Sequence, residues 1–555
     1  MELTMPLTES FFPAIEDEKI VNLTVGDILR IAAKEDPDKV ALVETDMECQ
    51  LGRKWTYQEL LQDAEKIAYN LLTHFNRGDK IAVWSPNTAE WAILEFACAL
   101  SGMVLVTINP SYQANELRYV LEQSKSSALY LIKEYRGTPM LKIAEEATKD
   151  LPKIPSIIDM ENKSEFYGID VSPVDLPQVK PADPAQIQYT SGTTGFPKGA
   201  VLHHLGLTNN ARLVTDRLGI DRTDIWLNYM PMFHTAGCAL ALLGCVQKRA
   251  KFIMVKFFDP PKVNALAEQE KATTFLGVPT MLIALLDSYR SNPVDFSSVK
   301  IAVSGGSMVA PELVRQVKDI INCKFSTVYG QTETSPVLTQ TFPEDSETDI
   351  CNTVGQPLPN KDIAILDPKN SKILPLNTVG EICARGYCNM LYYNDNPEAT
   401  KDTIDENGWL HTGDLGTMDE RGYVKITGRL KEMIIRGGEN LFPAEIENIM
   451  VEHPEVAEVA IVGLPDSKWG EIVGCFIRPA SDTKPKVAEL ISHCRKHLSP
   501  VKTPSKWIFV DDWPLTGSGK IQKFKFYDGI IVKDKNYISS EKYEDQFRGW
   551  GFTFF

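Results

Sequence analysis

The sequence predicts an α/β protein with a large N-terminal domain of layered, largely parallel sheets covered by helices, a β-rich subdomain, and a small α+β C-terminal domain. Three observations predict this class. Helical and strand patterns alternate through residues 23–180, which favours a parallel sheet covered on both faces. Strand patterns dominate from Gly380 onward. A separate set of helix and strand patterns follows Arg429.

Size and composition are those of a globular protein. The chain has 555 residues, which is longer than one ordinary domain. Hydrophobic residues make up 43% of it and charged residues 24%, a composition that excludes a disordered chain. The net charge of −16 argues against general nucleic-acid binding, because no excess of Lys and Arg is there to replace phosphate counterions. The ten cysteines form no C-x-x-C pair, so we expect reduced thiols in the core and neither disulfides nor a zinc site.

Two stretches bear on where the protein resides. The first twenty residues are acidic, which fits neither a signal peptide nor a transit peptide. The most apolar segment, Trp91–Ile108, is interrupted by Glu95 and by Ser101-Gly102, so it predicts a buried helix and a strand, not a membrane span. We expect a cytoplasmic protein without a transmembrane segment, with the mitochondrial matrix as the alternative.

The first elements follow from residue spacing. Helical periodicity predicts helices over Thr24–Ala33, Thr56–Leu72 and Gln113–Gln123. Short β-rich runs predict strands over Lys80–Trp84 and Met103–Ile108. The prolines at 173, 177, 181 and 184 mark a loop that leads into the next motif.

The stretch 189–199, YTSGTTGFPKG, combines glycines, hydroxyls and a lysine. Glycine lets a loop approach a ligand closely, and backbone N–H groups, hydroxyls and an ammonium all favour anionic oxygen, so the stretch predicts a phosphate loop. It is not a Walker A loop, because Lys198 lies between Pro197 and Gly199. A surface turn is the alternative, which the apolar run at 200–202 disfavours.

This stretch resembles the phosphate-binding signature of the adenylate-forming superfamily, which includes acyl-CoA synthetases, luciferases and peptide-synthetase adenylation domains. The resemblance implies that a set of residues in it binds the phosphates of ATP. These residues are Thr190, Ser191, Gly192, Thr193, Thr194, Gly195 and Lys198.

Beyond the loop the chain predicts a strand, an apolar helix and three strand-loop pairs. In order they are Trp226–Pro231, His234–Val246, Thr274–Pro279, Lys300–Gly306 and Ser326–Glu333. The last two pairs place short polar segments at the carboxyl ends of a parallel sheet, where such folds bind ligands.

The second of these segments, YGQTE at 329–333, resembles the superfamily segment that stacks an aromatic ring on adenine. The resemblance implies that Tyr329 is the adenine platform, that Thr332 and Glu333 are catalytic, and that Glu333 is the Mg²⁺-side carboxylate. One carboxylate plus substrate phosphates is a normal Mg²⁺ environment. Further ATP contacts are implied for Gly306, Gly330 and Gln331.

The acyl pocket is predicted around the apolar helix. His234, in PMFHTAG, is on its own most simply a packed core histidine, but the resemblance implies a wall or gate of the acyl pocket. Gly237 and Ala241 keep one face of this helix small, which either leaves room for an alkyl chain or permits tight helix packing. Gly305 is assigned to the same pocket.

Asp414 in TGD and Arg429 in ITGR resemble the superfamily residues that contact the ribose hydroxyls. A short carboxylate suits a diol, which presents two donors. The alternative is that Asp414 and Asp419 are turn residues flanking a hairpin.

In the C-terminal domain the sequence predicts two helices, Pro443–His453 and Lys486–Leu498. It also predicts three strands, Val456–Leu464, Ile472–Arg478 and Lys506–Val510. PLTGSGKIQK follows, and glycine on both sides of Ser518 makes a flexible loop that suits a lid delivering one cation. The resemblance implies that Lys520 reaches the α-phosphate and the substrate carboxylate. An exposed surface lysine is the alternative.

The resemblance, which covers roughly residues 20–530, also implies a domain rotation after adenylation. Lys431 falls on the hinge position, and Gly437, Gly438 and Glu439 on the coenzyme A channel. The predicted domains are an N-terminal adenylation domain over residues 1–429, a mobile lid over 430–530, and a tail of unknown role over 531–555.

The implied reaction joins ATP, with Mg²⁺, to a carboxylic acid, giving an acyl adenylate and pyrophosphate, and then an acyl-CoA. IIRGGENLFPAEIE, GSGKIQKFK and FPEDS most resemble medium-chain fatty acyl-CoA synthetases. An aryl-CoA ligase, an acyl-AMP ligase that loads a carrier protein, and a non-enzymatic nucleotide-binding protein are alternatives. The continuous stretch 414–441 disfavours the second, and the presence of Lys520, Glu333 and Asp414 the third. A homodimer is left open.

Overall fold

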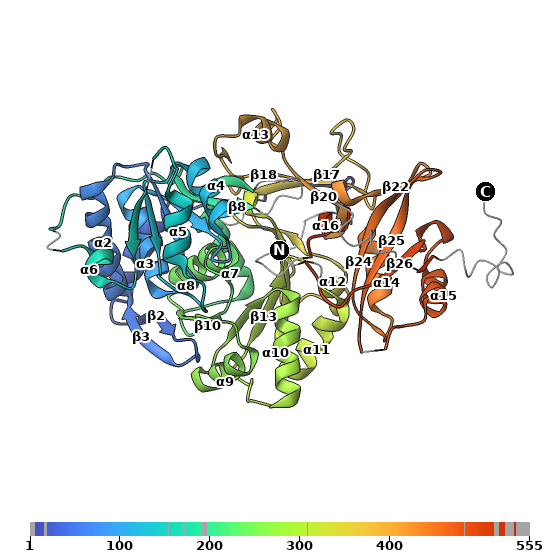
Figure 1. The fold of residues 1–555 in the computed structure, drawn as a ribbon, viewed down its shortest axis with the longest axis horizontal. Coiled ribbons are helices and arrows are strands. Elements are labelled where there is room, and N and C mark those ends of the chain that lie inside the picture. Colours follow the sequence, from blue (N-terminus) through green and yellow to red (C-terminus); the bar gives the residue numbers. More distant parts are fainter. Residues whose placement is uncertain are drawn as a thin grey trace. The chain divides into compact units, whose positions relative to one another are not determined.

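The computed structural model describes residues 6–15, 19–153, 155–169, 172–190, 197–307, 309–481, 483–514, 521–527 and 538–539. The chain divides into two compact units. The first comprises Met1–Ala364, Cys383–Thr412 and Asp419–Val424, and the second comprises Ile365–Ile382, Gly413–Met418 and Lys425–Phe555. Figure 1 shows the elements in the order of the chain.

One sheet of the first unit carries the phosphate-loop motif. Its strand order is β19-β9-β8-β5-β4-β6-β7. The strands from β8 to β7 are parallel, whereas β9 runs antiparallel to β8, and β19 antiparallel to β9. Their bounds are β4 (Lys80–Trp84), β5 (Val104–Ile108), β6 (Ala128–Leu131), β7 (Ser156–Asp159), β8 (Pro184–Thr190), β9 (Lys198–His203) and β19 (Tyr392–Tyr393).

The other large sheet of this unit has the order β16-β15-β14-β13-β12-β10-β11-β2-β3. Its centre, from β14 to β2, is parallel, and its edges are antiparallel. The bounds are β2 (Val40–Thr45), β3 (Leu51–Thr56), β10 (Ile225–Asn228), β11 (Lys251–Met254), β12 (Thr274–Gly277), β13 (Ile301–Gly305), β14 (Lys324–Gly330), β15 (Val337–Gln340) and β16 (Gln356–Pro357).

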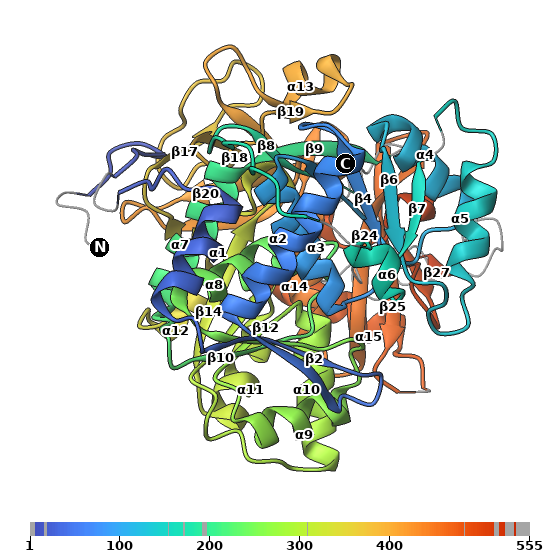
Figure 2. The same cartoon turned by 90° about the vertical axis from the view of Figure 1, so that its left-hand side faces the viewer.

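Helices cover both faces of this second sheet. Strand side chains alternate between faces, and on β11 Phe252 and Met254 join one core while Ile253 joins another. Helices α9, α10 and α11 line the second core, and α1, α2, α3, α7 and α8 pack in the first, which contains residues of both sheets (Figure 2). The predicted layers of helix and largely parallel sheet are therefore confirmed.

The helices of the first unit begin where the sequence supplies caps. Thr24 and Thr56 each form a capping box, and proline occupies the first turn of α9, α10, α11 and α13. The bounds are α1 (Val25–Glu35), α2 (Tyr57–His74), α3 (Ala89–Ser101), α4 (Ala114–Ser124), α5 (Met140–Thr148), α6 (Lys163–Tyr167), α7 (His204–Leu218), α8 (Gly244–Lys248), α9 (Pro260–Glu270), α10 (Pro279–Ser291), α11 (Pro311–Ile321), α12 (Glu347–Asn352) and α13 (Pro397–Thr403).

The predicted helix after His234 differs in kind from the prediction. It opens as the π-helix η1 (Ala236–Leu243) and continues as α8 to Lys248. An apolar run buried on all sides carries no periodicity that separates these helix types, so the sequence could not show the difference. The segment Trp91–Ile108 is a buried helix and a strand, as predicted.

A third sheet has the order β1-β17-β18-β20-β21, and the boundaries between the two units fall within it. The bounds are β1 (Phe11–Phe12), β17 (Lys361–Leu366), β18 (Gly380–Gly386), β20 (Leu410–Met418) and β21 (Val424–Arg429). Strands β18, β20 and β21 are the β-rich part predicted from Gly380 onward, whereas β1 and β17 come from earlier in the chain.

The C-terminal sheet has the order β23-β22-β25-β26-β27, and β24 also pairs with β25. On β24, Ile461 joins the core beneath α14 and α15, and its neighbours Ala460 and Val462 join a core on the other face. Each helix and strand predicted here is present. The bounds are β22 (Ile434–Arg436), β23 (Glu439–Leu441), β24 (Val456–Asp466), β25 (Gly470–Pro479), β26 (Lys506–Phe509), β27 (Ile538–Ser539), η3 (Leu430–Glu432), α14 (Pro443–Val451), α15 (Val487–His497), η4 (Pro500–Lys502) and α16 (Phe524–Tyr527).

Three sequence expectations can be compared with these elements. All ten cysteines are buried and free, as predicted. Within the described ranges, no helix combines the length and apolarity needed to cross a membrane. In the predicted tail, Ile538–Ser539 forms β27 and pairs antiparallel with β26.

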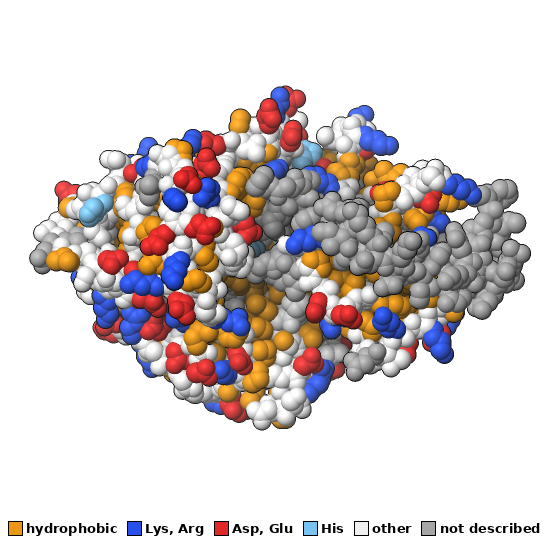
Figure 3. Space-filling model, viewed as in Figure 1, with side chains coloured by type: hydrophobic (Ala, Val, Ile, Leu, Met, Phe, Trp, Pro, Cys, Tyr) orange, Lys and Arg blue, Asp and Glu red, His pale blue; other side chains and the backbone are white. Residues whose placement is uncertain are grey.

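On the face of the first unit seen in Figure 3, basic and acidic side chains are interspersed.

Candidate active site

The phosphate-loop motif joins two paired strands. β8 ends at Thr190 and β9 begins at Lys198, and these two residues face each other across the antiparallel pair. The Thr190 hydroxyl donates to the Lys198 carbonyl at 3.4 Å. The predicted phosphate contacts Ser191, Gly192, Thr193, Thr194 and Gly195 lie outside the described residues. Both ends of the motif therefore lie in paired strands.

The YGQTE segment lies at the carboxyl end of β14, next to the end of β13, and the two strands are parallel. After Gly330 the chain forms the 3₁₀ turn η2 (Thr332–Thr334). Gly306, just past β13, has φ +77°, a left-handed conformation that favours glycine. Both predicted ligand segments therefore share one edge of the sheet.

Glu333 is buried at this end of the sheet. It is 8% exposed, its carbonyl accepts from the Met390 N–H at 2.7 Å, and the Tyr393 hydroxyl donates to its Oε1 at 2.6 Å. A hard cation such as Mg²⁺ prefers oxygen ligands, and a buried carboxylate can supply them. Tyr329, at the end of β14, is itself 7% exposed.

Lys198 and Glu333 both contact the side chain of Tyr393. The Lys198 ammonium lies 4.9 Å from the centroid of the Tyr393 ring, a cation–π distance. The structure thus connects a predicted phosphate-binding lysine and the predicted metal-side carboxylate. Tyr393 could not be identified from the sequence, because a buried tyrosine in a two-residue strand carries no spacing signal.

In the second unit the two predicted ribose contacts lie together. The Arg429 Nε lies 3.1 Å from Asp414 Oδ1, and the Asp414 side chain is 12% exposed against 48% for that of Arg429. Asp414 lies within β20, and Asp419 in the turn that follows it. The neighbouring Gly413 N–H donates to Glu381 at 2.9 Å, which fixes the backbone beside Asp414.

The predicted hinge and coenzyme A residues lie in one short stretch. Lys431 is exposed in η3. Gly437 and Gly438 form the exposed turn between β22 and β23, and both have positive φ. Glu439 opens β23. Lys520 lies outside the described residues.

An ionic cluster joins the neighbour of the predicted hinge residue to the segment after Lys520. The Lys523 ammonium lies 3.0 Å from Glu432 and 2.7 Å from Glu447. Burial disfavours its charged form, but the two carboxylates outweigh burial and raise its pKa. Glu432 directly follows Lys431, so the chain beyond the predicted lid loop is anchored next to the predicted hinge residue. Sequence patterns gave no signal for this cluster.

The predicted acyl-pocket residues are mostly packed. His234 is half-buried, and its Nδ1 accepts from the Ala236 N–H at 3.1 Å. A Cβ at Gly237 would lie 2.4 Å from the Pro231 carbonyl, and one at Gly305 2.3 Å from the Val328 carbonyl. Ala241 is fully buried. These glycines have a packing reason of their own, and the pocket remains a prediction.

Two family models match the chain. The model described as AMP-binding enzyme matches residues 29–394. The model described as AMP-binding enzyme C-terminal domain matches residues 445–520.

Relatives match nearly the whole chain. The YngI protein of Bacillus subtilis (strain 168) is 37% identical over 542 residues, which cover 92% of this chain and 98% of that protein. The medium-chain acyl-CoA ligase ACSF2, mitochondrial, of Homo sapiens is 34% identical over 536 residues, 90% of this chain and 86% of that protein.

Solved structures share the fold. ATP-bound MatB from Rhodopseudomonas palustris has a TM-score of 0.82 at 27% identity and covers 95% of this chain and 100% of its own. The o-succinylbenzoate CoA synthetase MenE from Bacillus subtilis, in complex with its acyl-adenylate intermediate, has a TM-score of 0.80 at 27% identity, covering 91% and 98%. The fold is that of an adenylate-forming enzyme. The chain belongs to the AMP-binding enzyme family.

Proposed function

We propose that this protein activates a carboxylic acid with ATP, releasing pyrophosphate, and transfers the acyl group from the resulting adenylate to coenzyme A. The observation that carries the proposal is the cluster in which Tyr393 contacts both Lys198, at the start of β9, and Glu333, just past β14. The medium-chain acyl-CoA ligases among the relatives support a medium-chain fatty acid as the substrate.

The chemistry needs the charges that these residues supply. A carboxylate is a poor electrophile, and its attack on the α-phosphate brings anions together. Lys198 and Lys520 neutralise the charge that grows on the phosphates. Attack forms the bond from carboxylate oxygen to phosphorus and breaks the bond to pyrophosphate. A thiolate then attacks the acyl carbon of the mixed anhydride, and AMP leaves.

We further propose that Glu333 holds Mg²⁺ together with the substrate phosphates. The buried carboxylate provides the oxygen ligand that this cation prefers. When bound, the cation polarises phosphoryl oxygens and neutralises charge. The MenE structure that contains ATP and a magnesium ion supports the same choice here. Thr332 contributes its hydroxyl beside Glu333.

The remaining assignments follow the same resemblance. Tyr329 stacks on adenine, Asp414 and Arg429 bind the ribose, and residues 430–530 act as a lid that pivots at Lys431. A cytoplasmic location is the simplest proposal, with the mitochondrial matrix as the alternative, since the ACSF2 relatives are named as mitochondrial. Self-association as a homodimer is an open part of the proposal.

Pyrophosphate release with a panel of acids, with and without coenzyme A, tests the function. The proposal expects acid-dependent release, and acyl-CoA formation when coenzyme A is added. Release only with aromatic acids would favour an aryl-CoA ligase. Adenylation without transfer to coenzyme A would favour an acyl-AMP ligase, and no release with any acid would favour a nucleotide-binding protein.

The preferred chain length is the first specific prediction. We expect acids of roughly six to twelve carbons to outperform acetate, because each buried methylene contributes about 0.8 kcal/mol. The comparison is of kcat/KM for straight-chain acids. A clear preference for acetate or benzoate would contradict it. Gly237 is unsuited to probing the pocket, because any side chain there meets the Pro231 carbonyl.

The second prediction concerns ribose binding. Asp414→Asn should raise the KM for ATP about tenfold, as expected for weakening a charged hydrogen bond, with kcat little changed. The contact is similar in the ground and transition states, so it affects binding more than turnover. Asp419→Asn, the same change in the adjoining turn, is the control and should leave the KM for ATP unchanged. A fall in kcat at constant KM would remove Asp414 from the ribose site.

A further inference from the structure

One tyrosine side chain contacts both charged residues of the phosphate site. The Tyr393 hydroxyl donates to Glu333 Oε1 at 2.6 Å, and the Lys198 ammonium lies over its ring, 4.9 Å from the centroid. Tyr393 is 6% exposed. A neutral ring can contact a cation and a carboxylate without cancelling the charge of either one.

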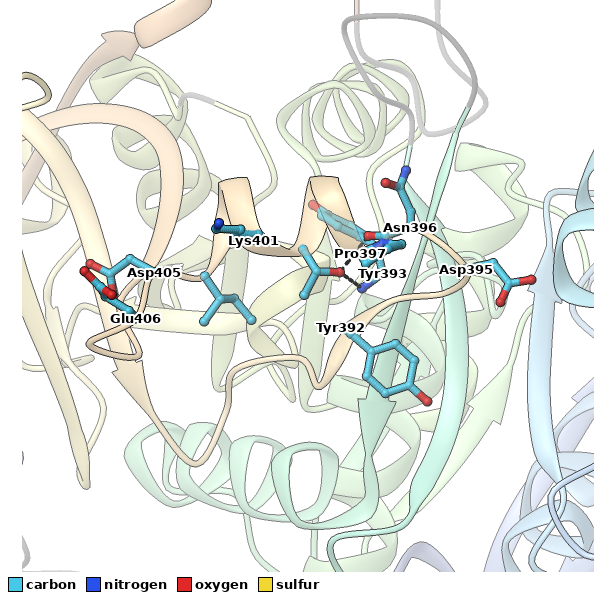
Figure 4. Close-up of a pocket in the computed structure, with 10 residues that line it drawn as sticks. Tyr392, Tyr393, Asp395, Asn396, Pro397, Lys401, Asp405 and Glu406 are labelled. Carbon is cyan, nitrogen blue, oxygen red and sulfur yellow. Dashed lines mark hydrogen bonds between the residues drawn. The ribbon is translucent and has the colours of Figure 1, made fainter.

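Backbone hydrogen bonds hold the residues around Tyr393 against both β9 and the YGQTE segment. The Asn394 N–H donates to the Gly199 carbonyl at 2.8 Å, and the Met390 N–H donates to the Glu333 carbonyl at 2.7 Å. Figure 4 shows Tyr393 just before α13, where its N–H donates to the Thr400 hydroxyl at 2.9 Å. The strap 390–394 therefore joins β9, which begins at Lys198, to the YGQTE turn.

The Tyr393 hydroxyl is the donor of its bond to Glu333. An ionised carboxylate only accepts hydrogen bonds, so the tyrosine supplies the proton of this bond. A hydrogen bond to an ionised acceptor is of the stronger kind, so it can orient the carboxylate.

We propose that Tyr393 is a positioning residue for adenylation, which sets the places of the Glu333 carboxylate and the Lys198 ammonium relative to each other. This inference rests on the proposed function, which assigns the metal side of ATP to Glu333 and the phosphates to Lys198. Tyr393 itself transfers no proton and forms no bond to substrate.

The test uses the full chain and a matched pair of variants. Tyr393→Phe removes the hydroxyl and keeps the ring. Tyr392→Phe makes the same change at a neighbour that is 44% exposed, and both residues line the surface pocket of Figure 4. Tyr393→Phe should lower kcat/KM for octanoate-dependent pyrophosphate exchange about tenfold, as for loss of a charged hydrogen bond. It should also raise the Mg²⁺ concentration needed for half-maximal rate. Tyr392→Phe should change neither quantity.

A double-mutant cycle separates positioning from general stability. In a Glu333→Gln background, Tyr393→Phe should cost less than about twofold, because its acceptor has already lost its charge. Tyr393→Leu, which also removes the ring, should be worse than Tyr393→Phe with Lys198 present and equal to it in a Lys198→Met background. Equal costs of Tyr393→Phe in both Glu333 backgrounds would overturn the assignment.

Calorimetric binding of MgATP gives a readout that does not depend on turnover. Tyr393→Phe should weaken MgATP binding while ATP binding without Mg²⁺ stays within about twofold, and thermal unfolding checks that each variant is folded. If no acid supports pyrophosphate release by the wild type, the proposed function fails, and the comparison of MgATP binding by the wild type and Tyr393→Phe still decides the role of Tyr393. Unchanged MgATP affinity in folded Tyr393→Phe, or no MgATP binding by the wild type, overturns the inference.

Discussion

Replacing Lys520 by alanine should lower the rate of adenylation by about two to three orders of magnitude, the usual cost of deleting one preorganised charge partner of a transition state. Binding of ATP should change little, because the lysine acts on charge that develops during attack on the α-phosphate. The measurement is pyrophosphate exchange with octanoate, combined with calorimetric ATP binding. Coenzyme A capture of a supplied acyl adenylate should survive in the same variant.

Lys525→Ala is the control for this variant. Lys525 lies in the same segment and is exposed, so its loss removes an equal charge without touching the reaction. We expect exchange close to that of the wild type. Near wild-type exchange in Lys520→Ala would remove Lys520 from the mechanism. Weakened ATP binding with normal turnover would make it a binding residue instead.

Lys431→Pro should separate the two half-reactions in the opposite sense. Proline fixes φ near −65°, which a 3₁₀ turn such as η3 tolerates, so the variant should fold but lose the torsional change of a hinge. Pyrophosphate exchange should stay largely intact. Thioester formation should fall about a hundredfold, the cost of misplacing the reacting groups.

Lys431→Ala is the matched control, because it removes the side chain and leaves the backbone torsions unrestricted. It should retain both half-reactions. If Lys431→Pro and Lys520→Ala lost both half-reactions in equal proportion, with folding verified, a single fixed active site would have to replace the two-conformation account.

The sequence predicted those parts of the fold that local spacing encodes. Thr24 and Thr56 cap the helices they were expected to begin, and the predicted strand-loop pairs at 300–306 and 326–333 open with strands β13 and β14. Such signals need only neighbouring residues, since periodicity, caps and turn chemistry all act over a few positions.

The parts that sequence reasoning missed depend on distant pairing. Tyr393 reaches Glu333 only because β19 pairs with β9, which is far away in the sequence. Lys523 meets Glu432 and Glu447 across the C-terminal fold. The small face of the helix after His234 suggested room for an acyl chain, whereas Gly237 packs against the Pro231 backbone. Composition alone could not separate these two reasons for a glycine.

The central claim, activation through an acyl adenylate, is tested most directly by isotope transfer. Octanoate labelled with ¹⁸O in both carboxylate oxygens is converted to octanoyl-CoA, and the AMP and phosphate products are analysed by mass spectrometry. Thiolate attack breaks the bond between the acyl carbon and the bridging oxygen. Each AMP formed should therefore carry one ¹⁸O, and the thioester carbonyl should keep the other. Unlabelled AMP, or label in inorganic phosphate, would contradict an adenylate intermediate.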